Sequence, residues 1–152
     1  MNPYSVKGDI VEAELRQIGA TTIKCIHGKQ YFIEFKLDKD WTIAYAYNIN
    51  AENEYYLQRV EPYPLQHGVF KKITDLSAFI KQDVDKFINA KNSSNFKKFV
   101  EITNRMQNIG LEMEELFLNY NVDGVALAQL ETSLESLFQQ IQIIEKHSRY
   151  IK

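Results

Sequence analysis

The sequence has little of what covalent cross-linking or a membrane span requires. Its 152 residues include one cysteine, Cys25, so no disulfide can form within a single chain. The longest strictly apolar run, residues 43–47, is far shorter than the about 20 residues of a membrane-spanning helix. The N-terminus also lacks the basic stretch and apolar stretch of a secretory signal. These absences predict a cytoplasmic protein with no membrane segment.

Motifs that identify a reaction are missing as well. No glycine-rich phosphate loop, C-x-x-C or H-E-x-x-H pattern occurs. Cys25 and His27 fall on one face of a predicted strand, but two ligands are too few for zinc, and His27 and His67 each precede a glycine, as turn residues do. No nucleophile, base and orienting group converge. We therefore expect no enzyme activity, no metal and no cofactor.

Positive charge is absent from a long C-terminal stretch. Between Arg105 and Lys146 there is no Lys or Arg, whereas the same stretch contains seven carboxylates. The net charge of −2 gives no general attraction to nucleic acid, and no RNA-binding motif occurs, so a nucleic-acid partner is not expected. The uneven charge either orients a partner or a second copy of the chain, or belongs to an ordinary solvated surface.

What the sequence does contain is β-type alternation in its first half. Residues 21–27, 30–37, 41–48 and 54–61 alternate β-branched or aromatic residues with polar ones, which predicts four strands. The short connections at residues 27–30 and 38–40 favour antiparallel hairpins and a meander. Alternation places one set of side chains on a common core face: Ile23, Cys25, Tyr31, Ile33, Phe35, Trp41, Ile43, Tyr45 and Tyr47.

Helical spacing flanks these strands. Before them, Asp9 is predicted to cap a short helix that ends at Gly19. After them, Pro62, Pro64 and Gly68 interrupt the chain. A helix is then predicted over residues 74–89, with Thr74 or Asp75 as its cap and one apolar stripe facing the sheet: Leu76, Phe79, Ile80, Val84, Phe87 and Ile88.

The C-terminal third repeats one apolar rhythm twice. Two sets of residues follow steps of three and four, namely Phe99, Ile102, Met106, Ile109, Met113, Leu116 and Tyr120, then Leu127, Leu130, Leu134, Leu137, Ile141, Ile144 and Ser148. Each set lies on one side of a helix, which we call its seam. A break at residues 119–124, where Asp123 can cap the second helix, predicts an antiparallel hairpin. We therefore divide the chain into an α+β domain at residues 1–90 and a helical hairpin at residues 91–152, packed as one structural unit.

Apolar residues also lie outside the seam, which makes the hairpin wider than two helices can cover alone. Three partners could bury these residues. The first is the rest of the chain, either the preceding helix in a three-helix bundle or the sheet; the others are a second copy of the chain and a different protein. We predict a non-catalytic protein-interaction module, an adaptor, chaperone-like or regulatory protein that is dimeric. The residues expected to carry the contact are Met106, Leu111, Met113, Phe117, Leu118, Leu134, Phe138 and Ile143.

The alternative function is non-catalytic binding of a small ligand or anion. Tyrosines combine apolar area with a polar tip, and a planar arginine can grip a carboxylate or stack on a ring. Hydroxyls and lysines at the start of a helix favour anions. The residues expected for this alternative are Trp41, Tyr45, Tyr47, Tyr56, Arg59, Ser94, Lys97 and Lys98. Core filling by the aromatic residues and ordinary helix capping compete with it.

Overall fold

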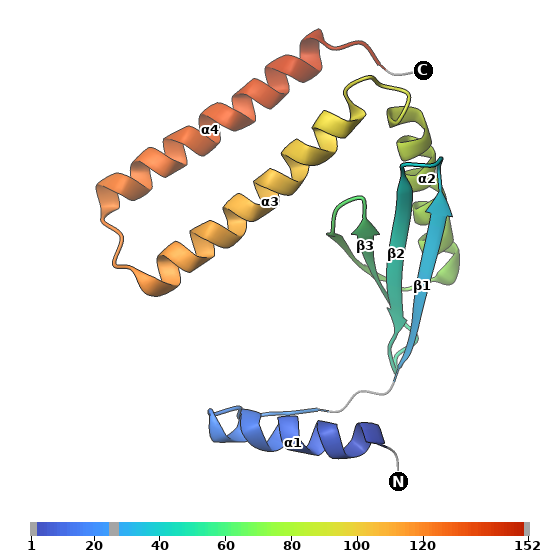
Figure 1. Ribbon diagram of the computed structural model, residues 1–152, viewed down its shortest axis with the longest axis vertical. Coiled ribbons are helices and arrows are strands. Elements are labelled where there is room, and N and C mark those ends of the chain that lie inside the picture. The colour runs from blue at the N-terminus through green and yellow to red at the C-terminus, as the bar shows by residue number, and fades with distance from the viewer. Residues whose placement is uncertain (1–2, 25–27, 151–152) are drawn as a thin grey trace.

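A computed structural model of the chain describes residues 3–24 and 28–150. A helix, α1 (Pro3–Gln17), comes first. Four strands follow: β1 (Lys29–Lys36), β2 (Thr42–Ile49), β3 (Tyr55–Glu61) and β4 (Leu65–Phe70). Three helices complete the chain: α2 (Ile73–Ala90), α3 (Phe96–Asn119) and α4 (Gly124–His147). Successive strands pair antiparallel in the order β1-β2-β3-β4, which confirms the predicted α+β fold with a meander, a packed helix and a C-terminal hairpin (Figure 1).

The strands differ from the prediction at both ends of the sheet. Residues 21–24 of the first predicted strand have no strand structure, and residues 25–27 lie outside the described residues. Conversely, β4 was not predicted, because Pro62 and Pro64 indicated that the sheet had ended. The two prolines lie in the turn between β3 and β4, where no ladder N–H is needed. Gly68, with φ of +88°, accompanies a register shift opposite Leu57, which hides the alternation of β4.

The core face of the central strands is as alternation predicts. The register pairs Tyr31 with Tyr47, Ile33 with Tyr45 and Phe35 with Ile43. The predicted turn at residues 38–40 is also confirmed. Its side chain Asp38 accepts hydrogen bonds through Oδ1 from the backbone N–H groups of Asp40 and Trp41, both at 2.9 Å. The backbone bond from Asp40 is the main cause that lowers the pKa of the Asp38 carboxyl.

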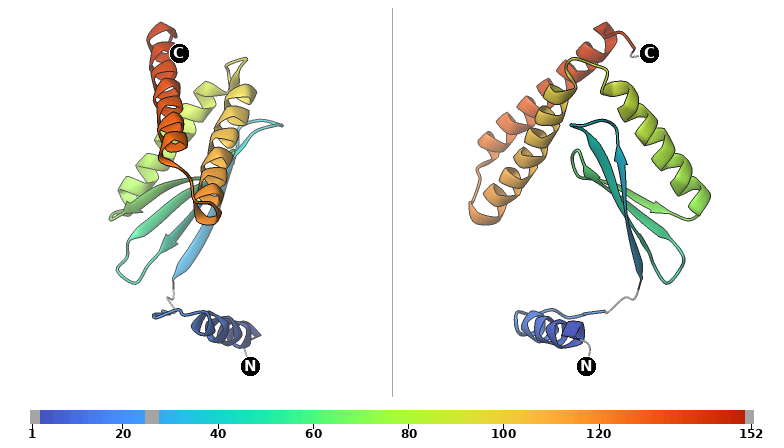
Figure 2. Two further views of the ribbon diagram at one scale, coloured as in Figure 1. Left: turned by 90° about the vertical axis from the view of Figure 1, so that its left-hand side faces the viewer. Right: turned by 45° about the vertical axis from the view of Figure 1, so that its right-hand side comes forward.

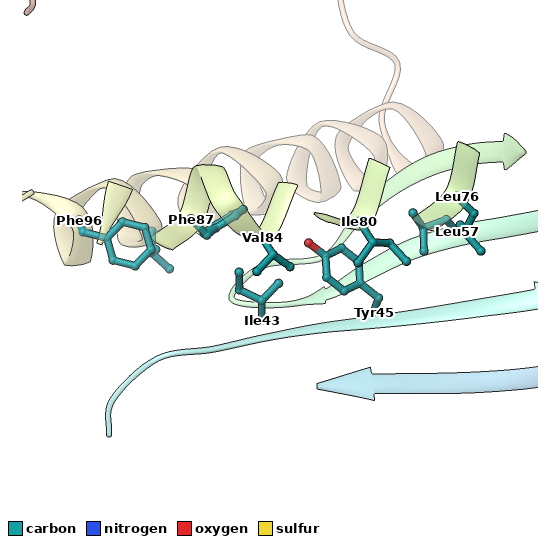
Figure 3. Close-up of a cluster of buried hydrophobic side chains, with 9 residues drawn as sticks. Ile43, Tyr45, Leu57, Leu76, Ile80, Val84, Phe87 and Phe96 are labelled. Carbon is teal, nitrogen blue, oxygen red and sulfur yellow. The ribbon is translucent and has the colours of Figure 1, made fainter. Parts of the chain in front are cut away.

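Helix α2 covers this face with the predicted apolar stripe. Leu76, Ile80, Val84 and Phe87 are buried against the sheet residues Ile43, Tyr45 and Leu57, whereas Ile88 is exposed (Figure 3). The cap prediction is wrong, because the helix begins after Lys72, which makes no side-chain cap. Asp75 instead lies in the first turn, where a carboxylate interacts favourably with the helix dipole.

Helix α1 stands apart from the rest of the molecule. It begins at Pro3, so Asp9 lies inside the helix and the predicted cap there is wrong, whereas the predicted stop at Gly19, with φ of +104°, is confirmed. Ile10, Val11 and Leu15 of its apolar side are exposed. Figures 1 and 2 show α1 beyond the end of the sheet that is remote from the link between α2 and α3.

Candidate interaction surface

The hairpin of α3 and α4 is held to the body of the protein at its root. Phe96 and Val100, in the first turns of α3, are buried. The Phe96 ring lies 4.7 Å from the Trp41 ring, edge to face, and the Phe99 ring lies 5.8 Å from that of Tyr63. Farther along α3, the Gln107 side chain donates a hydrogen bond to the carbonyl of Pro64. The first half of α3 is thereby fixed to the end of the sheet.

The link before α3 is fixed by a lysine. Lys91 Nζ donates to the carbonyl oxygen of Leu37 at 2.9 Å and forms an ion pair with Asp38 at 3.3 Å. These contacts join the end of α2 to the turn between β1 and β2. The position where the hairpin leaves the body is therefore set by packing and polar contacts together.

Beyond the root the hairpin projects away from the sheet. The two helices run antiparallel, as Figures 1 and 2 show, and their bounds match the predicted arms and the predicted break. The predicted cap is also confirmed, because Asp123 Oδ1 accepts from the backbone N–H groups of Val125 and Ala126, both at 2.9 Å. The predicted antiparallel hairpin is thus present with its turn defined by a capping carboxylate.

The seam between the two helices is closed only near the turn. Met113, Leu116, Leu127 and Leu130 are half-buried there. Toward the root the seam residues are exposed, as with Ile144, at 64% of its maximum. No residue of α4 is buried. Helix α3 is attached to the body at its root, whereas α4 covers it only at the far end, so most of the apolar seam faces solvent.

The predicted contact residues lie on this open hairpin. Seven of the eight are exposed and only Met113 is half-buried. Leu111 and Leu118, at 65% and 75% exposure, continue along α3 by helical spacing from Val100 and Gln107, beyond the point where the body supports that side. Phe117, Phe138 and Ile143 are exposed outside the seam. We call the exposed apolar residues of α3 and α4 the hairpin surface: Phe99, Ile102, Met106, Ile109, Leu111, Phe117, Leu118, Val125, Leu134, Leu137, Phe138, Ile141, Ile143 and Ile144.

The total accessible surface shows how much of the chain is uncovered. The molecule exposes 12685 Å². A compact monomer of the same 17.8 kDa is expected to expose about 8,000 Å². Contiguous apolar patches larger than a few hundred Å² are rare on monomers and mark sites of interaction. The open hairpin is therefore the candidate functional surface of this protein.

The residues of the alternative ligand site do not form one accessible surface. Tyr45 and Arg59 are buried in the core, Trp41 packs on Phe96, and Tyr47 stacks on Tyr31 at 4.7 Å between ring centres. Tyr56 follows the opposite face of the sheet from its neighbour Leu57. The remaining three residues, Ser94, Lys97 and Lys98, are exposed around the start of α3.

An apolar groove does adjoin one of these residues. Tyr47, Ile33 and Phe35 line one side of it and α2 the other, with Ile80 and Val84, and its volume is about 340 Å³. Ser77, Lys81 and Asp85 of α2 add polar side chains to its lining. Of the eight residues, Tyr47 lines this groove and Tyr56 lines a separate pocket near the start of β1. Ligand binding remains a prediction.

Arg59 forms a buried ion pair that sequence reasoning missed. Its Nη1 lies 2.8 Å from Asp83 Oδ2, and the Tyr45 hydroxyl donates to the same oxygen at 2.7 Å. Arg59 is 2% exposed, and its guanidinium carbon lies over the neighbouring rings of Tyr63, at 4.5 Å, and Phe87, at 4.8 Å. Burial, followed by the bond to Asp83, raises the pKa of Tyr45.

Asp83, which was not predicted, could have been found from its spacing along α2. Asp83 is spaced by three or four residues from Ile80 and Phe87, so it lies on the buried side of α2. A carboxylate at such a position requires a cation or hydrogen-bond donors. The pair therefore supports the core, and it leaves Arg59 without a free face for a ligand.

His67 provides a test of stability against pH. Its Nε2 is buried with no hydrogen-bond partner, and its ring lies 4.7 Å from that of Phe79. Burial first, and Arg59 second, lower its pKa from the ordinary value of 6.5. Between the lowered pKa and about 6.5, His67 binds a proton in the unfolded chain but not in the folded chain. The free energy of unfolding therefore decreases as the pH falls through about 6.5 toward the lowered pKa.

We expect His67→Phe to remove this acid sensitivity, because the phenylalanine side chain has no group that can bind a proton. The gain in melting temperature over the wild type should be larger at about pH 5.5 than at about pH 8. Thermal unfolding followed by circular dichroism measures it. His147→Phe, at an exposed position, is the control and should show no such trend. An identical gain at both pH values would contradict the assignment.

Other classes of site find no support in the part of the chain that the structure describes. Within residues 3–24 and 28–150 there is no cluster of three or more metal-ligating side chains. None of the helices described is long and apolar enough to cross a membrane. Comparison of the chain with protein families, curated proteins and solved structures yields no significant match.

Proposed function

We propose that this protein is a non-catalytic protein-interaction module, an adaptor, chaperone-like or regulatory protein, that self-associates through the hairpin surface. The observation that carries the proposal is that α4, a helix of 24 residues, buries no side chain in the single chain. Each Å² of apolar surface removed from water contributes about 25 cal/mol. A second protein surface is the natural cover for a helix of this kind.

Cover from within the chain has less support. The apolar stripe of α2 packs on the sheet, so it is not available to complete a three-helix bundle with α3 and α4. The sheet likewise receives only the root of α3, through Phe96 and Val100. Met106 and Met113 add flexible side chains to the hairpin, which suit a surface that adapts to what it contacts.

The test is the oligomeric state and its response to charge in the seam. We expect the wild type to be dimeric by light scattering and sedimentation, and the double variant Met113→Asp with Leu134→Asp to be monomeric. A buried, unpaired carboxylate on each arm of each protomer should weaken the association by about 100-fold or more. Trp41 fluorescence should stay native, because Trp41 packs at the root on Phe96.

Ser136→Asp is the matched control. Ser136 lies two residues from Leu134 on the polar side of α4, in the company of Thr132 and Gln139. The added charge is the same, but we expect the dimer to persist. A wild type that is monomeric at every concentration, or a double variant that associates as the wild type does, would overturn the proposal.

A further inference from the structure

Charge is divided between the two ends of the hairpin. The turn end, residues 109–134, contains five carboxylates and no Lys or Arg: Glu112, Glu114, Glu115, Asp123 and Glu131. The root, residues 91–105 and 141–150, contains six Lys or Arg residues and two carboxylates, Glu101 and Glu145. At the root, Lys97, Lys146 and Arg149 are exposed and free to act on a neighbouring surface. The apolar hairpin surface lies between two ends of opposite charge.

This polarity decides how a second hairpin can lie on the first. If the two hairpins lay parallel, the acidic turn ends would face each other and the basic roots would face each other. In opposite directions, each turn end lies beside the root of the other chain, and both contacts are attractive. A two-fold axis relates the two contacts, so both form at once.

Building on the self-association proposed above, we infer that the partner of the hairpin is a second copy of this chain, docked antiparallel so that four helices enclose one apolar core with each acidic turn end beside the other copy's basic root. The open seam toward the root of each hairpin, around Ile102 and Ile144, then receives the turn end of the other copy. This arrangement covers the seam where a single chain leaves it exposed.

The available surface is sufficient for such a dimer. Permanent dimer interfaces bury about 2,000–5,000 Å² in total over both partners. The accessible surface of 12685 Å², to which the exposed helix α1 also contributes, exceeds that of a compact monomer by more than each chain would bury. The helices are long enough as well, since 24 residues of α3 extend about 36 Å, several turns beyond the root contacts.

Charge reversal tests the orientation. Four substitutions at each end reverse its net charge, all at exposed positions. The turn-end variant carries Glu112→Lys, Glu114→Lys, Glu115→Lys and Glu131→Lys. The root variant carries Lys97→Glu, Lys98→Glu, Lys146→Glu and Arg149→Glu. In an antiparallel dimer each variant turns the attractive contacts into repulsive ones at both ends. We expect the dissociation constant, measured by sedimentation at low salt, to rise about tenfold in each.

The combined variant with all eight reversals separates the two orientations. It restores attraction in an antiparallel dimer, so its dissociation constant should return to within about threefold of the wild type. Differences among the variants should shrink at about 0.5 M salt. In a parallel dimer neither single set would weaken association, because like charges face each other before and after reversal. That result, or a combined variant as weak as the single sets, would overturn the inference.

Cross-linking gives an independent readout. In a Cys25→Ser background, one chain carries Asn121→Cys at the turn and another carries Ser94→Cys at the root. With a short bismaleimide, we expect cross-linked dimers only when the two chains are mixed. Cross-linking of the turn variant with itself would overturn the antiparallel arrangement while leaving the self-association of the proposed function standing. A wild type that is monomeric throughout would overturn both.

Discussion

Asp83→Ala is expected to lower the free energy of unfolding by about 3–5 kcal/mol, the usual cost of removing one partner of a buried ion pair. The cost arises because Arg59, at 2% exposure, would keep its charge without an anion, and the Tyr45 hydroxyl would lose its acceptor. Urea unfolding followed by Trp41 fluorescence measures the change.

Two further variants separate the ion pair from the helix that carries it. Asp85→Ala removes an exposed carboxylate two residues away on α2, and we expect a change within about 0.5 kcal/mol. The double variant Asp83→Leu with Arg59→Met replaces both charges by apolar groups, and it should recover most of the stability lost. If Asp83→Ala were as stable as the wild type, the guanidinium would have to reach water in solution.

Phe96→Ala is the second change with a large expected effect. The ring is 4% exposed and contacts three others, those of Trp41, Phe87 and Phe99. Removing a buried phenylalanine ring leaves a cavity and typically costs about 3–5 kcal/mol. We also expect Trp41 emission to shift to longer wavelength, because Phe96 covers that ring at 4.7 Å.

Phe32→Ala is the matched control for this prediction. Phe32 is an exposed phenylalanine on β1, on the face of the sheet opposite α2, and its removal should cost less than about 1 kcal/mol. A loss of that small size in Phe96→Ala, together with unchanged Trp41 emission, would show that α3 does not rest on Trp41. The root of the hairpin would then have to be held by other contacts.

The parts of the fold that could be predicted from the sequence depend on interactions between residues close together along the chain. The stripe of α2, the two arms of the hairpin and the capping carboxylate Asp123 each depend on spacings of two to four residues. The register of β1 and β2 follows from the turn at Asp38 in the same way. Local spacing also predicted where the hairpin turns back, although it could not show that the seam remains open toward the root.

The parts that were missed depend on contacts between distant residues. β4 forms because β3 offers it a partner, and its glycine and the flanking prolines, signs of a loop in the sequence, are accommodated by a bulge and a turn. Asp83 and Arg59 are 24 residues apart, and nothing in either local sequence specifies the other. The aromatic residues assigned to a ligand face differ in burial because Phe96 and α2 cover some and leave others open. Such outcomes require the three-dimensional arrangement.

Tyr63 occupies the junction between the two halves of the molecule. One side of its ring receives the Arg59 guanidinium and another receives Phe99 at the foot of α3. Tyr63 thus connects the ion pair between the sheet and α2 to the base of α3, a helix about 36 Å long. In a helix of this length, a change of direction at the base displaces the far end by much more than the base itself, so the packing around Tyr63 bears on where the turn of the hairpin lies.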